Sequence, residues 1–122
     1  FVVLTTPLTA ETRHLMSWDE FRLMKPTSIL VNAARGPVVD DEALYDALKT
    51  GKILRAALDV TSTEPLPLDS PLFTLDNILV MPHIGSAVIE TRWKMWMMAV
   101  NQLLMGLRGE RIPNCINEEV YG

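Results

Sequence analysis

Short apolar runs alternate along the chain with segments in which apolar residues recur every three or four positions. The short runs occupy residues 1–5, 28–33, 53–60 and 77–81. Strand-like runs that alternate with helical patterns favour βαβ units and a parallel sheet. The run at 53–60 is nearly all apolar, which is typical of a strand covered on both faces. We therefore predict an α/β fold built on a parallel sheet.

Polar residues mark the ends of the helical segments. Ser17 is followed by Glu20 three residues later, which predicts a capping box, and Pro26 ends this helix. A second helix is predicted between Asp40, as its N-cap, and Gly51. The apolar face of this second helix consists of Ala43, Leu44, Ala47 and Leu48.

A third helix is predicted from Ser86 to about Leu107, with Gly109 ending it. About 22 residues would span roughly 33 Å, which is long for a helix on a short sheet, so we expect it to reach a second domain. We interpret the Trp- and Met-rich cluster at 93–98 as core or interface packing, because its spacing is helical. The tail at 110–122 is expected on the surface.

Composition narrows the classes of function. The chain has 122 residues and a hydrophobic share of 48%, which fits one globular domain or part of one. A net charge of −4 without a basic stripe argues against a nucleic-acid partner. The apolar stretch at 95–107 is too short and too polar to span a membrane. The single cysteine, Cys115, fits a reducing, cytoplasmic compartment. No other Cys or His lies at metal-ligand spacing from it.

Three polar residues follow strand-like runs: Arg35, Glu64 and His83. Ligands bind at the carboxyl ends of strands in open α/β sheets, so this order suggests one site. A guanidinium can hold a carboxylate, an imidazole can move a proton, and a carboxyl group can orient the imidazole. Taken singly, each residue has a plainer interpretation. Arg35 could simply pair with an acid such as Asp40. His83 could be a loop histidine that bonds backbone groups, and Glu64 a solvated loop acid. Asp59 could cap a turn or accept hydrogen bonds from a bound amide.

Three segments together resemble the signatures of one family. Residues 31–40 (VNAARGPVVD), 58–65 (LDVTSTEP) and 82–87 (PHIGSA) look like motifs of the D-isomer-specific 2-hydroxyacid dehydrogenases, and their separations also fit. The stretches 61–67 and 107–110 are similar to the glyoxylate/hydroxypyruvate reductase branch. The resemblance extends to about Pro113.

The resemblance implies an organisation and a set of partners. The family folds as two Rossmann-like domains with the site in the cleft between them. Residues 1–85 would then be the C-terminal half of the dinucleotide-binding domain, and residues 86–122 the helix and tail of the interdomain or substrate-domain region. The cofactor would be NAD(P)H, without a choice between the two forms. The substrate would be a small 2-oxo or 2-hydroxy acid, and the intact protein a homodimer with no nucleic-acid or membrane partner.

The resemblance also implies roles for individual residues. Arg35 would bind the carboxylate of the 2-oxo acid, His83 would donate a proton to the carbonyl oxygen, and Glu64 would hydrogen-bond His83. The expected cofactor contacts are Pro7, Ala33, Asp59 and Gly85. Ile84 and Ser86 would line the same loop near the substrate, and no metal is expected.

The chain departs from the family in one respect. It contains no Gly-x-Gly-x-x-Gly, so we expect that phosphate-binding turn to precede Phe1 and the 122-residue chain to be an inactive, poorly stable fragment. Two alternatives to the reductase stay open at this point. One is a dinucleotide-sensing corepressor on the same fold, and the other is a truncated product without activity.

Overall fold

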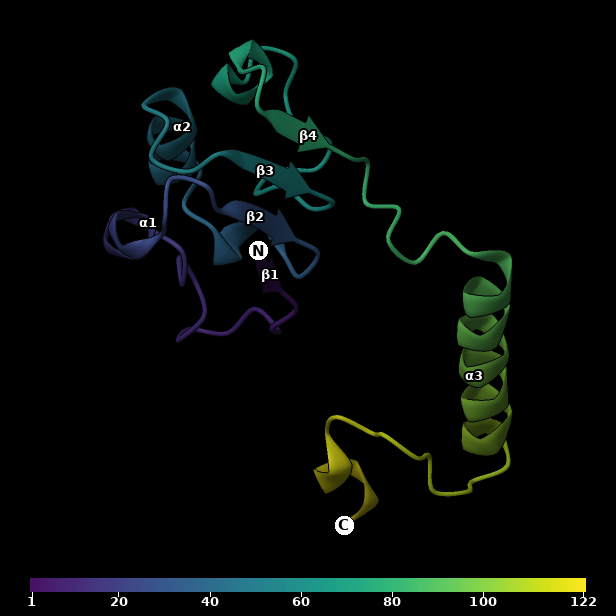
Figure 1. Ribbon diagram of the computed structural model, residues 1–122. Coiled ribbons are helices and arrows are strands. Elements are labelled where there is room, and N and C mark those ends of the chain that lie inside the picture. Colours follow the sequence, from purple (N-terminus) through teal and green to yellow (C-terminus); the bar gives the residue numbers. More distant parts are fainter. The chain divides into compact units, whose positions relative to one another are not determined.

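The structure is a computed structural model that describes residues 1–122, and it divides into two compact units, Phe1–Gly85 and Ser86–Gly122. The first unit contains a four-stranded sheet in the order β1-β2-β3-β4. All neighbouring strands are parallel, and their arrowheads point the same way in Figure 1. The strands are β1 (Val2–Leu4), β2 (Ile29–Asn32), β3 (Arg55–Leu58) and β4 (Ile78–Val80). The predicted α/β fold with a parallel sheet is confirmed.

Helices connect the first three strands. They are α1 (Trp18–Leu23) and α2 (Asp41–Lys49), with short 3₁₀ turns η1 (Gly36–Val38) and η2 (Pro71–Thr74). Glu20 Oε2 accepts the N–H of Ser17 at 3.1 Å, as the predicted capping box requires. Asp40 Oδ1 accepts the N–H groups of Glu42 and Ala43, both at 3.1 Å, so the predicted N-cap of α2 is confirmed.

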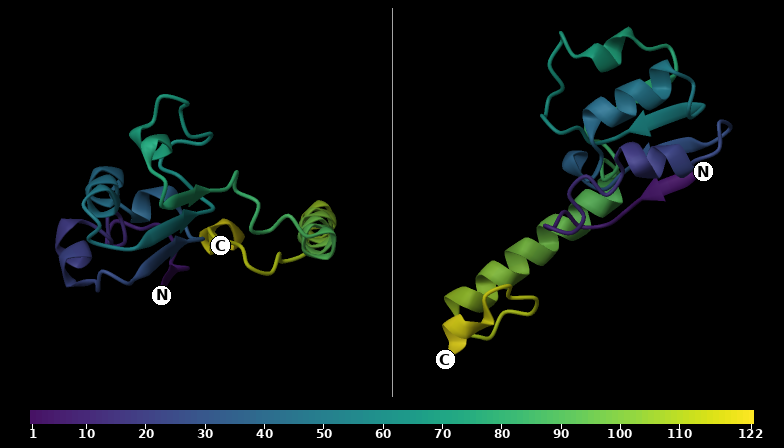
Figure 2. Two further views of the ribbon diagram at one scale, coloured as in Figure 1. Left: turned by 45° about the horizontal axis from the view of Figure 1, so that its top comes forward. Right: turned by 90° about the vertical axis from the view of Figure 1, so that its left-hand side faces the viewer.

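The core of the first unit lies between the sheet and these two helices. Successive right-handed crossovers in one direction place both helices on the same face, where α1 and α2 pack together (Figure 2). The strand residues buried on this face are Leu4, Leu30, Asn32, Ala56 and Leu58, and the apolar face of α2 is buried with them. In β4, Ile78 and Val80 are partly buried. The fully buried side chains include Leu30, Val38, Leu44, Ile53, Val60 and Leu72.

The opposite face of the sheet has no helix of the first unit on it. Val3, Val31, Ala57 and Leu79 stand in one row across the four strands. Val3 and Leu79 are both 57% exposed. The prediction that the run at 53–60 is covered on both faces is therefore wrong within this unit. In β3, Ala56 and Leu58 are buried against the helices, whereas Ala57 lies in the row on the opposite face.

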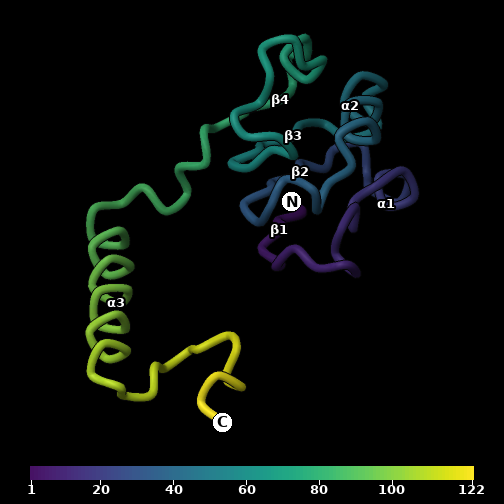
Figure 3. Tube along the Cα trace, turned by 180° about the vertical axis from the view of Figure 1, so that it is seen from behind, coloured from purple at the N-terminus to yellow at the C-terminus, as the bar shows by residue number.

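The second unit consists of α3 (Ile89–Leu107), the turn η3 (Glu118–Tyr121) and their connections, as the trace in Figure 3 shows. The helix begins at Ile89, not at the predicted Ser86, because the preceding residue Val88 is extended and offers no capping side chain. Gly109, at φ 71°, ends it as predicted. No residue of α3 is buried, so the Trp- and Met-rich cluster is not core of this unit. None of the helices is long and apolar enough to cross a membrane.

Candidate active site

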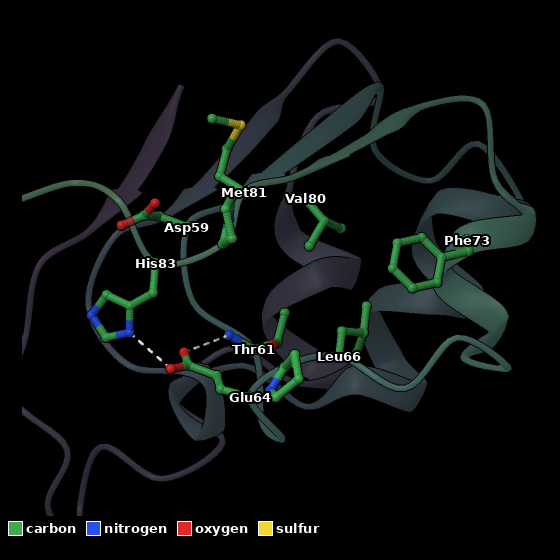
Figure 4. Close-up of a pocket in the computed structure, with 10 residues that line it drawn as sticks. Asp59, Thr61, Glu64, Leu66, Phe73, Val80, Met81 and His83 are labelled. Carbon is green, nitrogen blue, oxygen red and sulfur yellow. Dashed lines mark hydrogen bonds and ion pairs between the residues drawn. The ribbon is translucent and has the colours of Figure 1, made fainter. Parts of the chain in front are cut away.

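A carboxylate and an imidazole meet at the carboxyl end of the sheet. His83 Nδ1 lies 2.8 Å from Glu64 Oε2, and the dashed line in Figure 4 marks this contact. The other carboxylate oxygen, Oε1, accepts the N–H of Thr61 at 3.2 Å. Glu64 is therefore fixed at both oxygens and can orient the imidazole.

The surroundings of Glu64 favour its ionised form. The hydrogen bond with His83 is the largest cause that lowers the pKa of Glu64 from its ordinary value of 4.5. The slight burial of the carboxyl group opposes this shift, whereas the N–H of Thr61 and the charges of His83 and Arg35 add to it. The side chains of His83 and Glu64 are 46% and 40% exposed, so solvent screens the pair and its contribution to stability is at most about 1 kcal/mol.

The backbone of His83 has an uncommon conformation. Its φ is 53°, in the left-handed region, where a residue with a Cβ pays roughly 1–2 kcal/mol. The next two residues are bound by Asp59: Ile84 N–H donates to Oδ1 and Gly85 N–H to Oδ2, each at 2.8 Å. The turn after β3 and the turn after β4 are thereby joined at the position of His83.

A cavity of about 490 Å³ lies beside the pair. In Figure 4 the side chains of Leu66, Phe73 and Val80 line the part of the cavity away from His83. The second ring nitrogen of His83, Nε2, points away from Glu64 and from these apolar side chains (Figure 4). The imidazole therefore presents its free nitrogen on the side opposite this cavity.

Arg35 lies at a second cavity of about 520 Å³, at the ends of β1 and β2. The lining residues are Thr5, Thr6, Pro7, Leu8, Ala33, Ala34 and Arg35. Two expected cofactor contacts, Pro7 and Ala33, thus share a cavity with Arg35, whereas Asp59 lines the cavity beside His83. Arg35 Nη1 donates to the carbonyl of Ala34 at 2.7 Å. It forms no ion pair with Asp40, whose carboxylate caps α2, so that alternative is wrong.

Two residues shape this region through contacts that the sequence does not predict. Asn32 is 1% exposed and holds the turn before Arg35, since its Nδ2 donates to the carbonyl of Arg35 at 3.0 Å and its Oδ1 accepts from Ala34 at 3.1 Å. The sequence signal for this role of Asn32 was an amide side chain at the end of an apolar strand. Gly36 is buried against the backbone of Thr61 and Ser62, which a Cβ would overlap.

Space, and not backbone conformation, requires the glycine at position 36. The φ of Gly36 does not lie in the left-handed region that favours glycine. The position requires the absence of a side chain, because the Arg35 turn touches the Glu64 loop there. This contact between distant segments leaves no local pattern in the sequence.

The remaining predicted site residues lie on the loop after His83. Ile84 is 42% exposed, and Gly85 follows it in the first unit. Ser86 is the first residue of the second unit, where its carbonyl accepts from Val88 at 2.8 Å and from Arg92 Nε at 3.3 Å. No group of three or more His, Cys, Asp or Glu side chains could hold a metal ion.

The cavity at Arg35 has a feature that fits a bound cofactor. The hydroxyl of Thr6 is the one buried side-chain polar atom in the chain without a hydrogen-bond partner. Buried polar groups are nearly always paired, so an unpaired hydroxyl among cavity residues is suited to a polar ligand. Pro7 and Ala33 border the same space with exposed surfaces.

A parallel sheet with an imidazole–carboxylate pair and an arginine at its strand ends defines an α/β domain of the kind that binds a ligand at that edge. The chain belongs to the D-isomer specific 2-hydroxyacid dehydrogenase family, whose NAD binding domain matches residues 1–85. The expected family is thus confirmed.

Individual relatives agree with this assignment. Glyoxylate/hydroxypyruvate reductase B of Citrobacter koseri is 51% identical over 122 residues, which cover 100% of this chain and 38% of the relative. A crystal structure of a Thermus thermophilus protein has a TM-score of 0.88 at 48% identity, covering 94% of this chain and 37% of that one. The chain therefore spans 38% of the length of the curated relative it matches.

A third relative was solved with ligands. The NADPH-dependent glyoxylate/hydroxypyruvate reductase from Sinorhizobium meliloti, in complex with NADP and malonate, has a TM-score of 0.87 and 31% identity. The match covers 95% of this chain and 36% of that protein.

Proposed function

We propose that this chain serves in an NAD(P)-dependent reductase that converts a small 2-oxo acid, such as glyoxylate or hydroxypyruvate, into the D-2-hydroxy acid. The observation that carries the proposal is the 2.8 Å contact between His83 Nδ1 and Glu64 Oε2. The names of the relatives from C. koseri and S. meliloti support the substrate class. The structure with NADP supports a nicotinamide cofactor.

The chemistry divides between the cofactor and the residues of the chain. When bound, the nicotinamide supplies a hydride to the carbonyl carbon or accepts one in the reverse direction. His83 would hold a proton at Nε2 and give it to the carbonyl oxygen as that carbon is reduced. In the reverse direction Nε2 would accept the hydroxyl proton. Glu64 would keep the ring oriented through its contact with Nδ1.

Arg35 would bind the substrate carboxylate. Its Nη1 is occupied by the carbonyl of Ala34, but a guanidinium has five N–H donors and can hold a carboxylate with the others. Ile84 and Ser86 would line the substrate space on the loop after His83. Pro7, Ala33, Asp59 and Gly85 would contact the cofactor, with the Thr6 hydroxyl beside them.

The same proposal includes the setting of the protein. Residues 1–85 would form the C-terminal half of the dinucleotide-binding domain, and residues 86–122 would belong to the interdomain or substrate-domain region. The intact protein would be a cytoplasmic homodimer without nucleic-acid or membrane partners. The net charge of −4 supports the expected absence of a nucleic-acid partner, and the single Cys115 supports a reducing compartment.

Turnover tests the proposal. In a chimera, residues 1–122 replace the matching segment of the C. koseri reductase, and the oxidation of NADH or NADPH by glyoxylate is followed. We expect activity, and we expect His83→Gln to lower kcat at least about 100-fold while cofactor binding survives.

His14→Gln is the matched control, because the contact of His14 is with Asp40. Equal activity of the His83→Gln and parent chimeras would remove the proposed role. Cofactor binding without turnover in the parent chimera would favour a dinucleotide sensor.

A second substitution tests the carboxylate site. Arg35→Lys keeps the charge but replaces the planar fork with a point charge, so we expect a higher KM for glyoxylate with a smaller change in kcat. Initial rates over a range of glyoxylate concentrations measure this. Arg55→Lys, on the exposed end of β3, is the control. A KM that is unchanged in Arg35→Lys would exclude Arg35 as the carboxylate ligand.

A further inference from the structure

The loop that carries His83 is held from two sides. Glu64 binds the imidazole itself, whereas Asp59 binds the backbone just after it. The contact with Asp59 has no part in the proton transfer proposed above. It nevertheless lies within two residues of the proposed proton donor.

We propose that Asp59 is a positioning residue, whose two carboxylate oxygens hold the N–H groups of Ile84 and Gly85 and so fix the imidazole of His83 against Glu64. Its meaning for catalysis depends on the proposed function, but the positioning itself is a property of the fold. A carboxylate suits this task because it offers two acceptor oxygens to two successive N–H donors. An amide side chain offers only one.

The backbone of Asp59 is itself fixed in the sheet. Its N–H donates to the carbonyl of Asn32 at 2.9 Å, and the carbonyl of its neighbour Leu58 accepts from Met81 at 2.8 Å. The carboxylate therefore projects from a rigid strand end. Ile84 and Gly85 are exposed and outside regular secondary structure, and their N–H groups have no other acceptor.

The glycine at position 85 fits the same contact. A Cβ at this position would lie 2.7 Å from Asp59 Oδ2, closer than real contacts allow. The carboxylate thus occupies the space that a side chain would need. His83 has a left-handed conformation between these contacts, with Glu64 binding its side chain and Asp59 binding the backbone that follows it.

The pKa of Glu64 in the 122-residue chain reports whether the imidazole is in place, because the contact with His83 lowers it most. It can be followed by NMR of the side-chain carboxyl carbon during titration. In Asp59→Asn we expect the pKa of Glu64 to rise towards its ordinary value, because the released loop withdraws His83. Loss of the Asp59 charge alone would lower the pKa of Glu64 instead. The two explanations therefore predict opposite directions.

Further variants separate position from charge. Gly85→Ala keeps the charge of Asp59 but displaces its carboxylate, so the pKa of Glu64 should again rise. Asp76→Asn removes a charge from an exposed loop position and should leave it unchanged. In a His83→Gln background, Asp59→Asn should cause no additional rise, since the contact is already absent. A fall or no change of the Glu64 pKa in Asp59→Asn would overturn the proposal.

Hydrogen exchange on the unaltered chain decides the matter even if the variants do not fold. The amides of Ile84 and Gly85 should exchange roughly tenfold or more slowly than unprotected amides, since each donates to a charged acceptor. Exchange at the unprotected rate would overturn the proposal. None of these measurements involves turnover, so failure of the proposed function would be seen separately, in the His83→Gln chimera.

Discussion

At the scale of single residues, Glu64 is a group whose ionisation the fold favours. One of its oxygens contacts the imidazole of His83 and the other accepts a backbone N–H. Both contacts prefer the carboxylate to the carboxylic acid, so protonation of Glu64 weakens them. The contact between Glu64 and His83 should therefore weaken in acid.

The pH dependence of stability follows from the direction of this shift. The pKa of Glu64 is lower in the folded chain than its ordinary 4.5, so its stabilisation is present above that value and is lost as the pH falls through the folded pKa. Urea unfolding of the parent and Glu64→Gln should differ by at most about 1 kcal/mol near neutral pH and converge in acid. Glu119→Gln, in the exposed tail, is the control. A difference that stays constant with pH would contradict this account.

At the scale of elements, the cap of α2 also fastens neighbouring segments. The Asp40 carboxylate accepts two N–H groups of the helix and the hydroxyl of Ser17, at 3.2 Å. Ser17 precedes α1, so the two helices that cover the sheet share this carboxylate. Met16 also pairs with Val39 in an isolated parallel bridge.

Removal of the cap should have a measurable cost. We expect Asp40→Ala to lower the free energy of unfolding by about 1 kcal/mol, because two helical N–H groups lose their acceptor. Asp40→Asn should recover much of this. Asp46→Ala, at an exposed position inside α2, serves as the control in thermal or urea unfolding. Equal effects at positions 40 and 46 would show that the cap contributes nothing specific.

The contact between the Arg35 turn and the Glu64 loop is a second element-level feature. Gly36→Ala should lower the free energy of unfolding by about 1–3 kcal/mol, because the added methyl overlaps backbone atoms that cannot rotate away. Gly51→Ala is the informative comparison. There space is open and the cost comes only from φ 69°, so Asn should be tolerated at 51 but not at 36. Chemical unfolding of the four variants measures this, and equal tolerance of Asn would contradict it.

The sequence predicts those features that depend on local signals. The strands, the capping residues Ser17 and Asp40 and the glycines that end two helices all lie where their local patterns place them. The pairing of Glu64 with His83 was expected from strand order and from the family motifs. The start of α3 was misplaced by three residues, because Ser86 resembles a cap but the extended chain continues to Val88.

What the sequence does not predict depends on contacts between distant segments. Asp59 reaches residues 25 and 26 positions later, and Gly36 touches the backbone at Thr61. Neither contact has a local pattern, because it arises only when neighbouring strand ends are brought to one edge. Within the first unit, the face of β3 that no helix covers was missed for the same reason, since small apolar residues look alike whether or not a layer covers them.

At the scale of the whole molecule, the two units differ in what they bury. The unit Phe1–Gly85 has a core in which Leu44 is 0% exposed, whereas Leu103 of α3 is 62% exposed. Most of the stabilising apolar burial therefore belongs to the first unit.

This contrast gives a paired prediction. Leu44→Ala should lower the free energy of unfolding by roughly 2–5 kcal/mol, because it leaves a cavity in the core. Leu103→Ala should change it by less than about 0.5 kcal/mol. Circular dichroism during urea unfolding compares the two. A large effect of Leu103→Ala would show that Leu103 is covered in solution and would contradict this account.

The strand order β1-β2-β3-β4 has one more consequence. Each strand pairs with its predecessor, so the sheet can grow outward in the order in which a ribosome makes it, and no strand has to be inserted between two others. His83 follows the last of these strands, after Asp59 and Glu64 have both emerged. During synthesis, the four strands and the two carboxylates would therefore be available before the imidazole of His83.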